Sequence, residues 1–559
     1  MGLLGQTLLL CCLTLEAFAT GHKAAQPTVT TKYGKLRGET VSVKETDRKV
    51  DTFLGIPFAK PPVGELRFES PEPPEPWSSV RDATKEPAMC IQNEKISKDL
   101  LEKFGVKFDL PPVSEDCLYL NIFSPQGREM NSKLPVMVFI HGGGFSMGGA
   151  TMSNGAALSA YENVVFVSIQ YRLGIPGFFS NGDDQARGNF GFLDQVAALQ
   201  WIRENIEDFG GDPESVTIFG ESAGGVSVAA LVLSPLSKGL FHRAIAESGV
   251  ALIRGLFATK SEDLLPIRNL VANISGCDLG TLVKCLKRKT EDELILISEL
   301  MVTAALPACV DGVFMPKPPE EILANKEGNN VPFMIGNNDH EFSWMIPEAF
   351  NISGLTEGTD KETVLAFLKT FPWMVLSNKS IPLVMEEYFG DSNDPLEIRD
   401  RFLDLIADIM FVMPALRTAK YHRDSGFPVY FYEFQHRASK FKDSRPEFVK
   451  ADHGDELFFV LGGPFLSGNV LFQGSATEEE KRLSKHMMKY WANFARNGDP
   501  NSPDLAYWPK YEEDEAYLEI QLKPKSSRKL RENRFVFWTK TLPEKIQKIS
   551  EEEDDHMEL

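Results

Sequence analysis

Apolar residues in this chain gather in short runs, which are separated by segments whose apolar positions recur at helical spacing. Runs rich in β-branched and aromatic residues are typical of strands that are buried on both faces of a sheet. These runs occupy residues 116–123, 134–141, 164–171, 216–220, 243–249, 331–336 and 428–434. Helical spacing marks residues 189–206 and 478–497, and we expect the second to be the final helix. This alternation predicts an α/β protein with one large, mostly parallel central sheet flanked by helices.

Two long stretches interrupt the alternation of strands and helices. Residues 258–330 and about 340–425 have mainly helical patterns, and we predict that both are lid-like insertions. No internal repeat or flexible linker divides the chain, so residues 20–555 are expected to form a single domain.

The two ends of the chain have the features of targeting signals. An apolar run from Leu3 to Leu15 precedes Ala17-Phe-Ala19, which predicts a cleaved signal peptide over residues 1–19. The run is too short to cross a bilayer, and we expect no transmembrane segment. His556-Met-Glu-Leu559 resembles the His-Asp-Glu-Leu retrieval signal, apart from its second position. We therefore expect the lumen of the endoplasmic reticulum, partial secretion, and the retrieval receptor as a partner; a frayed acidic tail is the alternative.

Charge and cysteine usage agree with a lumenal protein. The 559 residues include 59 Lys and Arg against 79 Asp and Glu, a formal net charge of −20, which argues against nucleic acid and anionic membranes as partners. Sequence proximity favours the disulfides Cys90–Cys117 and Cys277–Cys285 in an oxidising compartment. Cys309 is expected to be a buried thiol. The uneven spacing is unlike that of a zinc site, and no metal is expected.

Three Asn-x-Ser/Thr sequons fit the same compartment. We regard Asn273, Asn351 and Asn378 as candidate glycosylation sites.

A nucleophilic serine is indicated by Val216-Thr-Ile-Phe-Gly-Glu-Ser222-Ala-Gly-Gly225. The stretch predicts a strand, a tight turn at Ser222 and a helix of small residues. Glycines two positions before and after the serine permit a turn that a Cβ would block. Such a turn exposes the hydroxyl and directs the amino end of the helix at it. The serine is a useful nucleophile only if a base and an anion-stabilising site lie nearby.

The anion-stabilising site is predicted from His141-Gly-Gly-Gly144, which follows a buried strand. Consecutive glycines let backbone N–H groups approach a developing oxyanion. A phosphate loop is the rival for a glycine run, but no Lys-Ser or Lys-Thr follows. We assign the oxyanion hole to the amides of Gly143, Gly144 and Ala223. His141 is expected to be a structural hydrogen-bonding residue rather than the base.

The base should follow the acid in the chain, which in turn should follow the serine, because this order is typical of the elbow motif. Four histidines satisfy that order: His422, His436, His453 and His486. We favour His453, which lies in the glycine-containing loop Ala-Asp-His-Gly-Asp-Glu. The acid should come from the loop after residues 331–336, where Asp339 and Glu341 are both candidates. Either carboxylate could hold the imidazole tautomer, so chemistry alone leaves the choice open.

Four motifs together resemble the type B carboxylesterase and cholinesterase family of α/β-hydrolases. They are Gly220-Glu-Ser-Ala-Gly224, His141-Gly-Gly-Gly-Phe145, Ser114-Glu-Asp-Cys-Leu-Tyr-Leu-Asn121 and Asp452-His-Gly-Asp-Glu456, and the resemblance covers nearly the whole mature chain. The tail is similar to that of mammalian liver and intestinal carboxylesterases. The resemblance implies an α/β-hydrolase fold with helical insertions over the active site. It also implies that Glu341 is the acid, and it supports both disulfides.

The resemblance implies a serine esterase without metal or organic cofactor. Such an enzyme would hydrolyse uncharged esters, some amides and thioesters, with xenobiotic and lipid esters as substrates. A cholinesterase is disfavoured, because residues 91–116 lack the tryptophan that would cover a quaternary ammonium. A non-catalytic relative would typically lack the serine or the histidine. An acylglycerol lipase is the remaining alternative, since the apolar segment 457–466 could form a lipid-facing flap.

Overall fold

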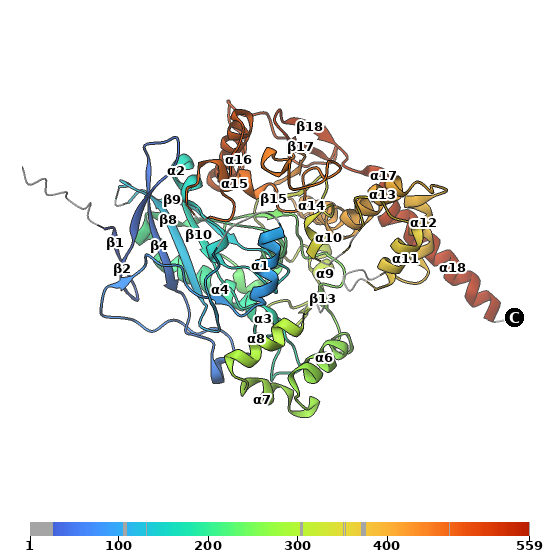
Figure 1. Cartoon of the computed structure of the whole chain (residues 1–559), viewed down its shortest axis with the longest axis horizontal. Coiled ribbons are helices and arrows are strands. Elements are labelled where there is room, and N and C mark those ends of the chain that lie inside the picture. Colours follow the sequence, from blue (N-terminus) through green and yellow to red (C-terminus); the bar gives the residue numbers. More distant parts are fainter. Residues whose placement is uncertain are drawn as a thin grey trace, which may run out of the picture.

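A long twisted sheet runs through the molecule (Figure 1). The computed structural model describes residues 26–557, except 104–108, 130, 302–305, 350, 351, 353, 371–375 and 469. The expected signal peptide, Asn351 and the last two residues lie outside this part of the chain.

Eleven strands of the described chain form the central sheet, in the order β18-β17-β16-β15-β12-β11-β9-β10-β8-β4-β3. Their bounds are β3 Glu39–Ser42, β4 Lys49–Pro57, β8 Tyr119–Pro125, β9 Leu134–Ile140, β10 Val165–Ile169, β11 Gly211–Glu221, β12 Arg243–Glu247, β15 Phe333–Asn338, β16 Val429–Phe434, β17 Ala516–Ile520 and β18 Lys525–Arg528. Neighbouring strands from β10 to β17 pair in parallel, and the strands at both edges pair antiparallel. The expected mostly parallel sheet is therefore confirmed.

Helices cover the sheet on two faces and create two cores. In β9, Val136, Val138 and Ile140 face one core, while Met137 and Phe139 face the other. The first core includes α4 (Phe190–Asn205), α5 (Ala223–Leu233) and α14 (Met413–Asp424); the second includes α2 (Ala156–Glu162), α15 (Leu457–Val460) and α16 (Glu478–Asn497). Because a strand buried on both faces has no polar side to expose, its sequence is a continuous apolar run.

The two interrupting stretches are largely helical. The first contains α6 (Leu265–Ser275), α7 (Leu282–Lys287), α8 (Glu291–Leu300) and α9 (Pro319–Ala324), together with the two-stranded sheet of β13 (Phe257–Ala258) and β14 (Ala308–Cys309). The second contains α10 (Met345–Ala349), α11 (Lys361–Thr370), α12 (Ser380–Phe389), α13 (Pro395–Ala407) and a π-helical turn at Asp408–Val412 that leads into α14. In Figure 1, α6 to α8 extend below the sheet, and α11 to α13 lie beside the carboxyl-terminal helices.

The cysteines are paired as the sequence suggested. Cys90 is bonded to Cys117, and Cys277 to Cys285. Cys309 is a buried free thiol, and burial raises its pKa to about 11. Of the three sequons, Asn273 in the last turn of α6 and Asn378 in the turn before α12 are exposed. Their glycosylation stays a prediction.

The expectation that residues 478–497 form the final helix is wrong. After α16 the chain adds β17, β18, α17 (Glu532–Val536) and α18 (Leu542–Met557). The added strands are short, and β18 is an exposed edge strand, so neither has a long apolar run. Charged residues dominate α18 and obscure its narrow apolar face. Throughout the described chain, no helix combines the length and apolar character that a membrane span requires.

The alternative of a lipid-facing flap at residues 457–466 is not supported by the structure. Its apolar side chains are at most 4% exposed and pack between α16 and the sheet. The run is apolar because it belongs to the second core. It gives no support to binding at a lipid surface.

Candidate active site

Ser222 lies in the sharp turn between β11 and α5. Its backbone has φ 57° and ψ −123°, a strained conformation for a residue with a side chain. The turn depends on Gly224, because a Cβ there would lie 2.0 Å from the carbonyl oxygen of Ile140 in the neighbouring strand. The amide of Ser222 donates to the carbonyl of Glu247, which fixes the turn against β12. Strand and helix thus hold the serine at the amino end of α5.

The glycine loop after β9 lies beside this serine. A Cβ on Gly142 would be 3.1 Å from the Cβ of Ser222. Gly143 and Gly144 have φ of +100° and +60°, which glycine adopts without strain. Within the described chain, neither of their amides donates a hydrogen bond. The amide of Ala223, the first residue of α5, has no acceptor inside its helix. Three N–H donors are therefore left for a ligand next to Ser222.

The ring of His141 packs against the backbone of the glycine loop. Its ring stacks on Tyr171 with a centroid distance of 4.4 Å, and Nδ1 lies 2.9 Å from the carbonyl oxygen of Gly142. Burial lowers the pKa of His141 to about 4, so the ring is neutral at physiological pH. This is the structural environment that the sequence predicted for it.

A short bond joins His453 and Glu341. His453 Nδ1 lies 2.6 Å from Glu341 Oε2, and the glutamate side chain is fully buried. The other carboxylate oxygen, Oε1, accepts from Ser248 Oγ and from the backbone N–H of Asn338, each at 2.6 Å. Asp339, the other acid candidate, instead accepts from the amide of Ala451 at 3.1 Å. Of the two candidates, the structure thus brings Glu341 to the imidazole.

Two of the three other candidate bases have different partners. His422 Nε2 lies 2.7 Å from the carbonyl oxygen of Val331, and His436 Nε2 lies 3.0 Å from Glu480 Oε1. His422 contacts the segment just before β15, and His436 contacts α16. Neither pairs with Glu341.

A second carboxylate faces His453, and sequence reasoning missed it. His453 Nε2 lies 3.0 Å from Glu221 Oε1, while no hydrogen bond joins it to Ser222 Oγ among the described contacts. Glu221 directly precedes the serine in the Gly-Glu-Ser-Ala-Gly turn, which is the one sequence signal that could have found it. Both ring nitrogens of His453 are thus next to carboxylates.

These carboxylates influence the protonation of His453. Burial opposes the charged imidazolium, but Glu221, Glu341 and Asp452 outweigh it and raise the pKa of His453 to about 9. Burial raises the pKa of Glu221 to about 7, although the charge of His453 acts in the opposite direction. The charge of each group therefore favours the charged form of the other.

An aromatic side chain covers one face of the base. The ring of Phe411 lies 4.7 Å from the ring of His453, between centroids, and its side chain is 4% exposed. Phe411 belongs to the π-helical turn Asp408–Val412, and such turns occur often at functional sites. This contact makes the wall beside His453 apolar.

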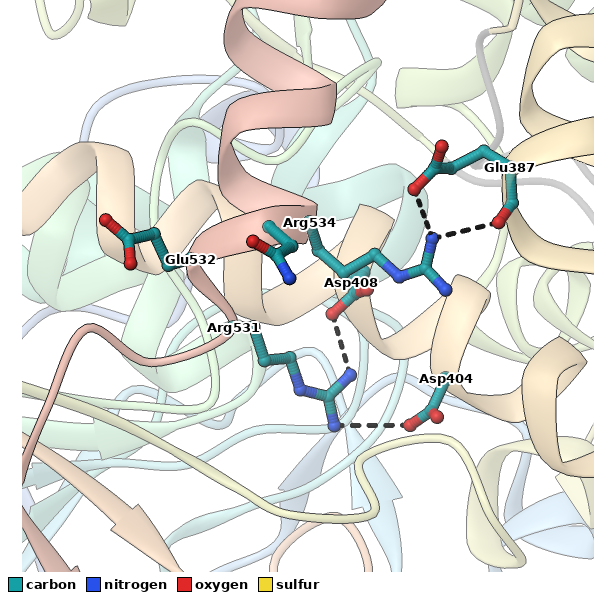
Figure 2. A pocket seen from close by; sticks show the side chains of 7 residues that line it. Glu387, Asp404, Asp408, Arg531, Glu532 and Arg534 are labelled. Carbon is teal, nitrogen blue, oxygen red and sulfur yellow. Dashed lines mark hydrogen bonds and ion pairs between the residues drawn. The ribbon is translucent and has the colours of Figure 1, made fainter.

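A polar pocket lies behind the loop that carries Glu341 (Figure 2). The pocket has a volume of about 670 Å³ and is lined by Glu387, Asp404, Asp408, Arg531, Glu532, Asn533 and Arg534. Arg531 pairs with Asp408 at 2.7 Å and Asp404 at 3.2 Å, and it donates to the carbonyl oxygen of Asp339 at 3.3 Å. Arg534 pairs with Glu387 at 2.7 Å, whereas Glu532 pairs with Lys529 outside the lining. The contact of Arg531 with Asp339 joins the C-terminal segment to the loop that carries Glu341.

Within the described residues, no group of three or more His, Cys, Asp or Glu side chains is arranged to hold a metal ion.

Comparison with known proteins identifies the family. A model described as the carboxylesterase family matches residues 25–538. The chain belongs to the carboxylesterase family. A medium-chain fatty acyl-CoA hydrolase precursor from Anas platyrhynchos is 51% identical over 97% of this chain and 96% of its own length. The pyrethroid hydrolase Ces2e from Rattus norvegicus is 51% identical, over 98% of this chain and 95% of its own.

A third relative, cocaine esterase from Homo sapiens, is 49% identical over 98% of this chain and 97% of its own length. The expected α/β-hydrolase fold and carboxylic-ester hydrolase class are therefore confirmed. A carboxylesterase needs a nucleophile, a base and oxyanion donors close together, which is the grouping found around Ser222.

Substitution of Glu221 tests its effect on the base. The Glu221 charge favours imidazolium, so Glu221→Gln should lower the pKa of His453. Because only neutral imidazole accepts a proton, the acid limb of kcat/KM should move to lower pH. Initial rates of p-nitrophenyl acetate hydrolysis between about pH 5 and pH 9 measure this shift.

Glu214→Gln is the matched control, because Glu214 lies on the same strand but its side chain is 74% exposed. Its acid limb should coincide with that of the unmodified enzyme. An acid limb that does not move in Glu221→Gln contradicts the assigned influence of Glu221.

Proposed function

We propose that this carboxylesterase hydrolyses uncharged carboxylic esters with Ser222 as nucleophile, His453 as base and Glu341 as acid. The observation that carries the proposal is the 2.6 Å contact between His453 Nδ1 and buried Glu341 Oε2, next to a strained serine. A carboxylate at Nδ1 fixes the tautomer that leaves Nε2 free to accept a proton. The chain order of serine, acid and histidine is that of the α/β-hydrolases.

Hydrolysis would proceed by two acyl transfers. Neutral His453 takes the Ser222 proton at Nε2 while Ser222 Oγ bonds to the ester carbonyl carbon. The carbonyl oxygen becomes an oxyanion that accepts hydrogen bonds from the amides of Gly143, Gly144 and Ala223. Imidazolium then protonates the departing alcohol as the C–O bond breaks, which leaves an acyl-serine. Water deprotonated by His453 attacks that acyl group, and the returned proton releases Ser222 and the carboxylic acid.

Glu341 and Glu221 have different tasks in this sequence. Glu341 stays ionised and stabilises the imidazolium that forms in both halves of the reaction. Glu221 faces Nε2 at 3.0 Å, so it stabilises imidazolium when Nε2 is turned from the serine. The proton is transferred only when Nε2 turns to Ser222 Oγ.

The substrate class is inferred from the wall of the site and from the relatives. Phe411 gives the site an apolar wall, which suits acyl and alcohol groups without charge. The relatives' names specify fatty acyl-CoA, pyrethroid, cocaine and acylcarnitine hydrolysis. We propose that this enzyme accepts xenobiotic and lipid esters, with some amides and thioesters among its substrates.

Replacement of the nucleophile tests the proposed mechanism. Ser222→Ala should lower kcat for p-nitrophenyl acetate by at least about 10³-fold, because acyl transfer to the enzyme is lost. Labelling by a fluorophosphonate probe should disappear as well, while the thermal midpoint stays near that of the unmodified enzyme. Retained hydrolysis or labelling in a folded Ser222→Ala protein contradicts the assignment of Ser222.

We propose that the enzyme works in the lumen of the endoplasmic reticulum. In support, α18 extends away from the body and ends at Met557, next to the final residues of the retrieval-like tail (Figure 1). The disulfides Cys90–Cys117 and Cys277–Cys285 suit an oxidising compartment.

Changes to the tail test this localisation. Deletion of residues 556–559 should raise the secreted fraction in cultured cells, because the receptor-binding signal is lost. Met557→Asp creates His-Asp-Glu-Leu and should lower secretion below that of the unmodified enzyme. Immunoblots of medium and lysate measure both. Equal secretion of all three proteins contradicts retrieval through the tail.

A further inference from the structure

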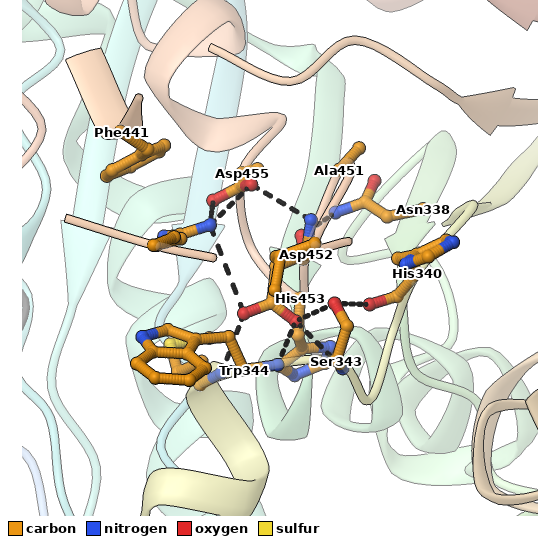
Figure 3. A network of polar contacts seen from close by, with 12 residues as sticks. Asn338, His340, Ser343, Trp344, Phe441, Ala451, Asp452, His453 and Asp455 are labelled. Carbon is orange, nitrogen blue, oxygen red and sulfur yellow. Dashed lines mark hydrogen bonds and ion pairs between the residues drawn. The ribbon is translucent and has the colours of Figure 1, made fainter. Parts of the chain in front are cut away.

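The acid and the base lie on two loops that are joined along their length (Figure 3). The acid loop follows β15 at residues 339–344, and the base loop spans residues 449–456. The backbone N–H of His340 donates to the carbonyl oxygen of Ala451 at 3.0 Å. In the opposite direction, the amide of Ala451 donates to Asp339 Oδ1 at 3.1 Å. The position of His453 relative to Glu341 therefore depends on contacts between these loops.

Asp452 joins the two loops through several hydrogen bonds. It directly precedes His453, and its carboxylate is fully buried against the acid loop. Oδ2 accepts from the amide of Met345 at 2.6 Å. Oδ1 accepts from the amides of Ser343 and Trp344, each at 3.3 Å, and lies 3.1 Å from Ser343 Oγ. These backbone N–H groups lie at the amino end of α10, where they have no acceptor within the helix, and they stabilise the Asp452 carboxylate.

Asn338 makes the reciprocal contact from the acid side. Its Nδ2 donates to the carbonyl oxygen of Asp452 at 2.7 Å and to Glu456 Oε2 at 2.5 Å. Its backbone N–H donates to Glu341 Oε1 at 2.6 Å. One residue thus contacts the acid itself and the backbone beside the base.

We propose that Asn338, Ser343 and Asp452 form a loop clasp that positions His453 against Glu341 during catalysis. Asn338, at the end of β15, binds the backbone of the base loop, and Asp452 binds the backbone of the acid loop. Neither loop can therefore shift without breaking buried hydrogen bonds. A misplacement of about 1 Å between catalytic groups can cost on the order of 10²-fold in rate. The loop clasp rests on the proposed function, because it positions the base of that mechanism.

Asp452 also adds charge beside the base. Three carboxylates act on His453: Glu221 from β11, Glu341 from the acid loop and Asp452 from the base loop. Phe411, from the π-helical turn, adds no charge. Loss of the Asp452 charge should therefore change the protonation of His453, an effect that a purely structural residue would not have.

Asp455 offers a matched control on the same loop. It is 3% exposed and pairs with Arg445 through two contacts of 2.9 and 2.8 Å. It also accepts from the amide of Asp452 at 2.9 Å, and neither Arg445 nor Asp452 belongs to the acid loop. Asp455→Asn removes a buried carboxylate without touching the acid loop.

The test compares Asp452→Asn with Asp455→Asn in the full chain. Asp452→Asn should lower kcat for p-nitrophenyl acetate on the order of 10²-fold with KM within about threefold, because the base is displaced. The acid limb of kcat/KM should also move to lower pH. Asp455→Asn should lower the thermal midpoint but keep kcat within about threefold of the unmodified enzyme. A folded Asp452→Asn with unchanged kcat and acid limb overturns the proposal, as does an equal fall of kcat in Asp455→Asn.

If Asp452→Asn does not fold, two substitutions of Ser343 test the loop clasp instead. Ser343 Oγ lies 2.7 Å from the carbonyl oxygen of His340 and 3.1 Å from Asp452 Oδ1, so it contacts both sides. Ser343→Ala should lower kcat several-fold with KM unchanged, and Ser343→Thr, which keeps the hydroxyl, should restore most of it. Equal kcat in Ser343→Ala and the unmodified enzyme overturns the loop clasp.

Parallel assays of the unmodified enzyme and Ser222→Ala separate the two levels of the proposal. If hydrolysis does not depend on Ser222, the proposed function fails. If it does, and the variants of Asp452 and Ser343 match the unmodified enzyme, only the loop clasp fails.

Discussion

The interaction on which the site depends is the buried contact between Glu341 and His453. A carboxylate without solvent must be hydrogen-bonded, or its charged form is strongly disfavoured. Glu341 meets this demand with Ser248, Asn338 and His453, all within 2.6 Å. These hydrogen bonds hold the buried carboxylate in one position. The contact at Nδ1, in turn, fixes the imidazole tautomer that leaves Nε2 to accept the serine proton.

The fold brings these groups together because parallel strands end at the same edge of the sheet. β11 ends beside Ser222, β12 beside Ser248 and β15 beside Glu341. The base loop reaches the same edge from beyond β16. Ser222 is kept in a strained backbone conformation by the packing of Gly224 on β9. The packing of the core strands thus stabilises the strained conformation of Ser222, the residue that must project into the site.

Local chemistry explains what the sequence could predict. Buried strands have continuous apolar runs, and the serine turn and glycine loop need small residues at fixed offsets, so all were visible in the chain. Chemistry left Asp339 and Glu341 open, because only the fold decides which carboxylate reaches His453. Glu221 and Asp452 went unrecognised because their contacts join residues that are far apart in the sequence. Only the position of Glu221 directly before Ser222 gave a signal. The lipid-facing flap at residues 457–466 was considered for a related reason. An apolar run has the same sequence pattern in a buried core and on a lipid-binding surface.

The rate of the Glu341→Gln enzyme tests the central claim most directly. Glutamine keeps the size of the side chain but removes the charge that stabilises imidazolium and fixes its tautomer. If Glu341 is the acid, kcat/KM for p-nitrophenyl acetate should fall by about 10³- to 10⁴-fold in a folded protein. Asp339→Asn, from the same loop, should stay within about tenfold of the unmodified enzyme. A Glu341→Gln enzyme within tenfold of the unmodified one, or an equal fall in Asp339→Asn, would contradict the account.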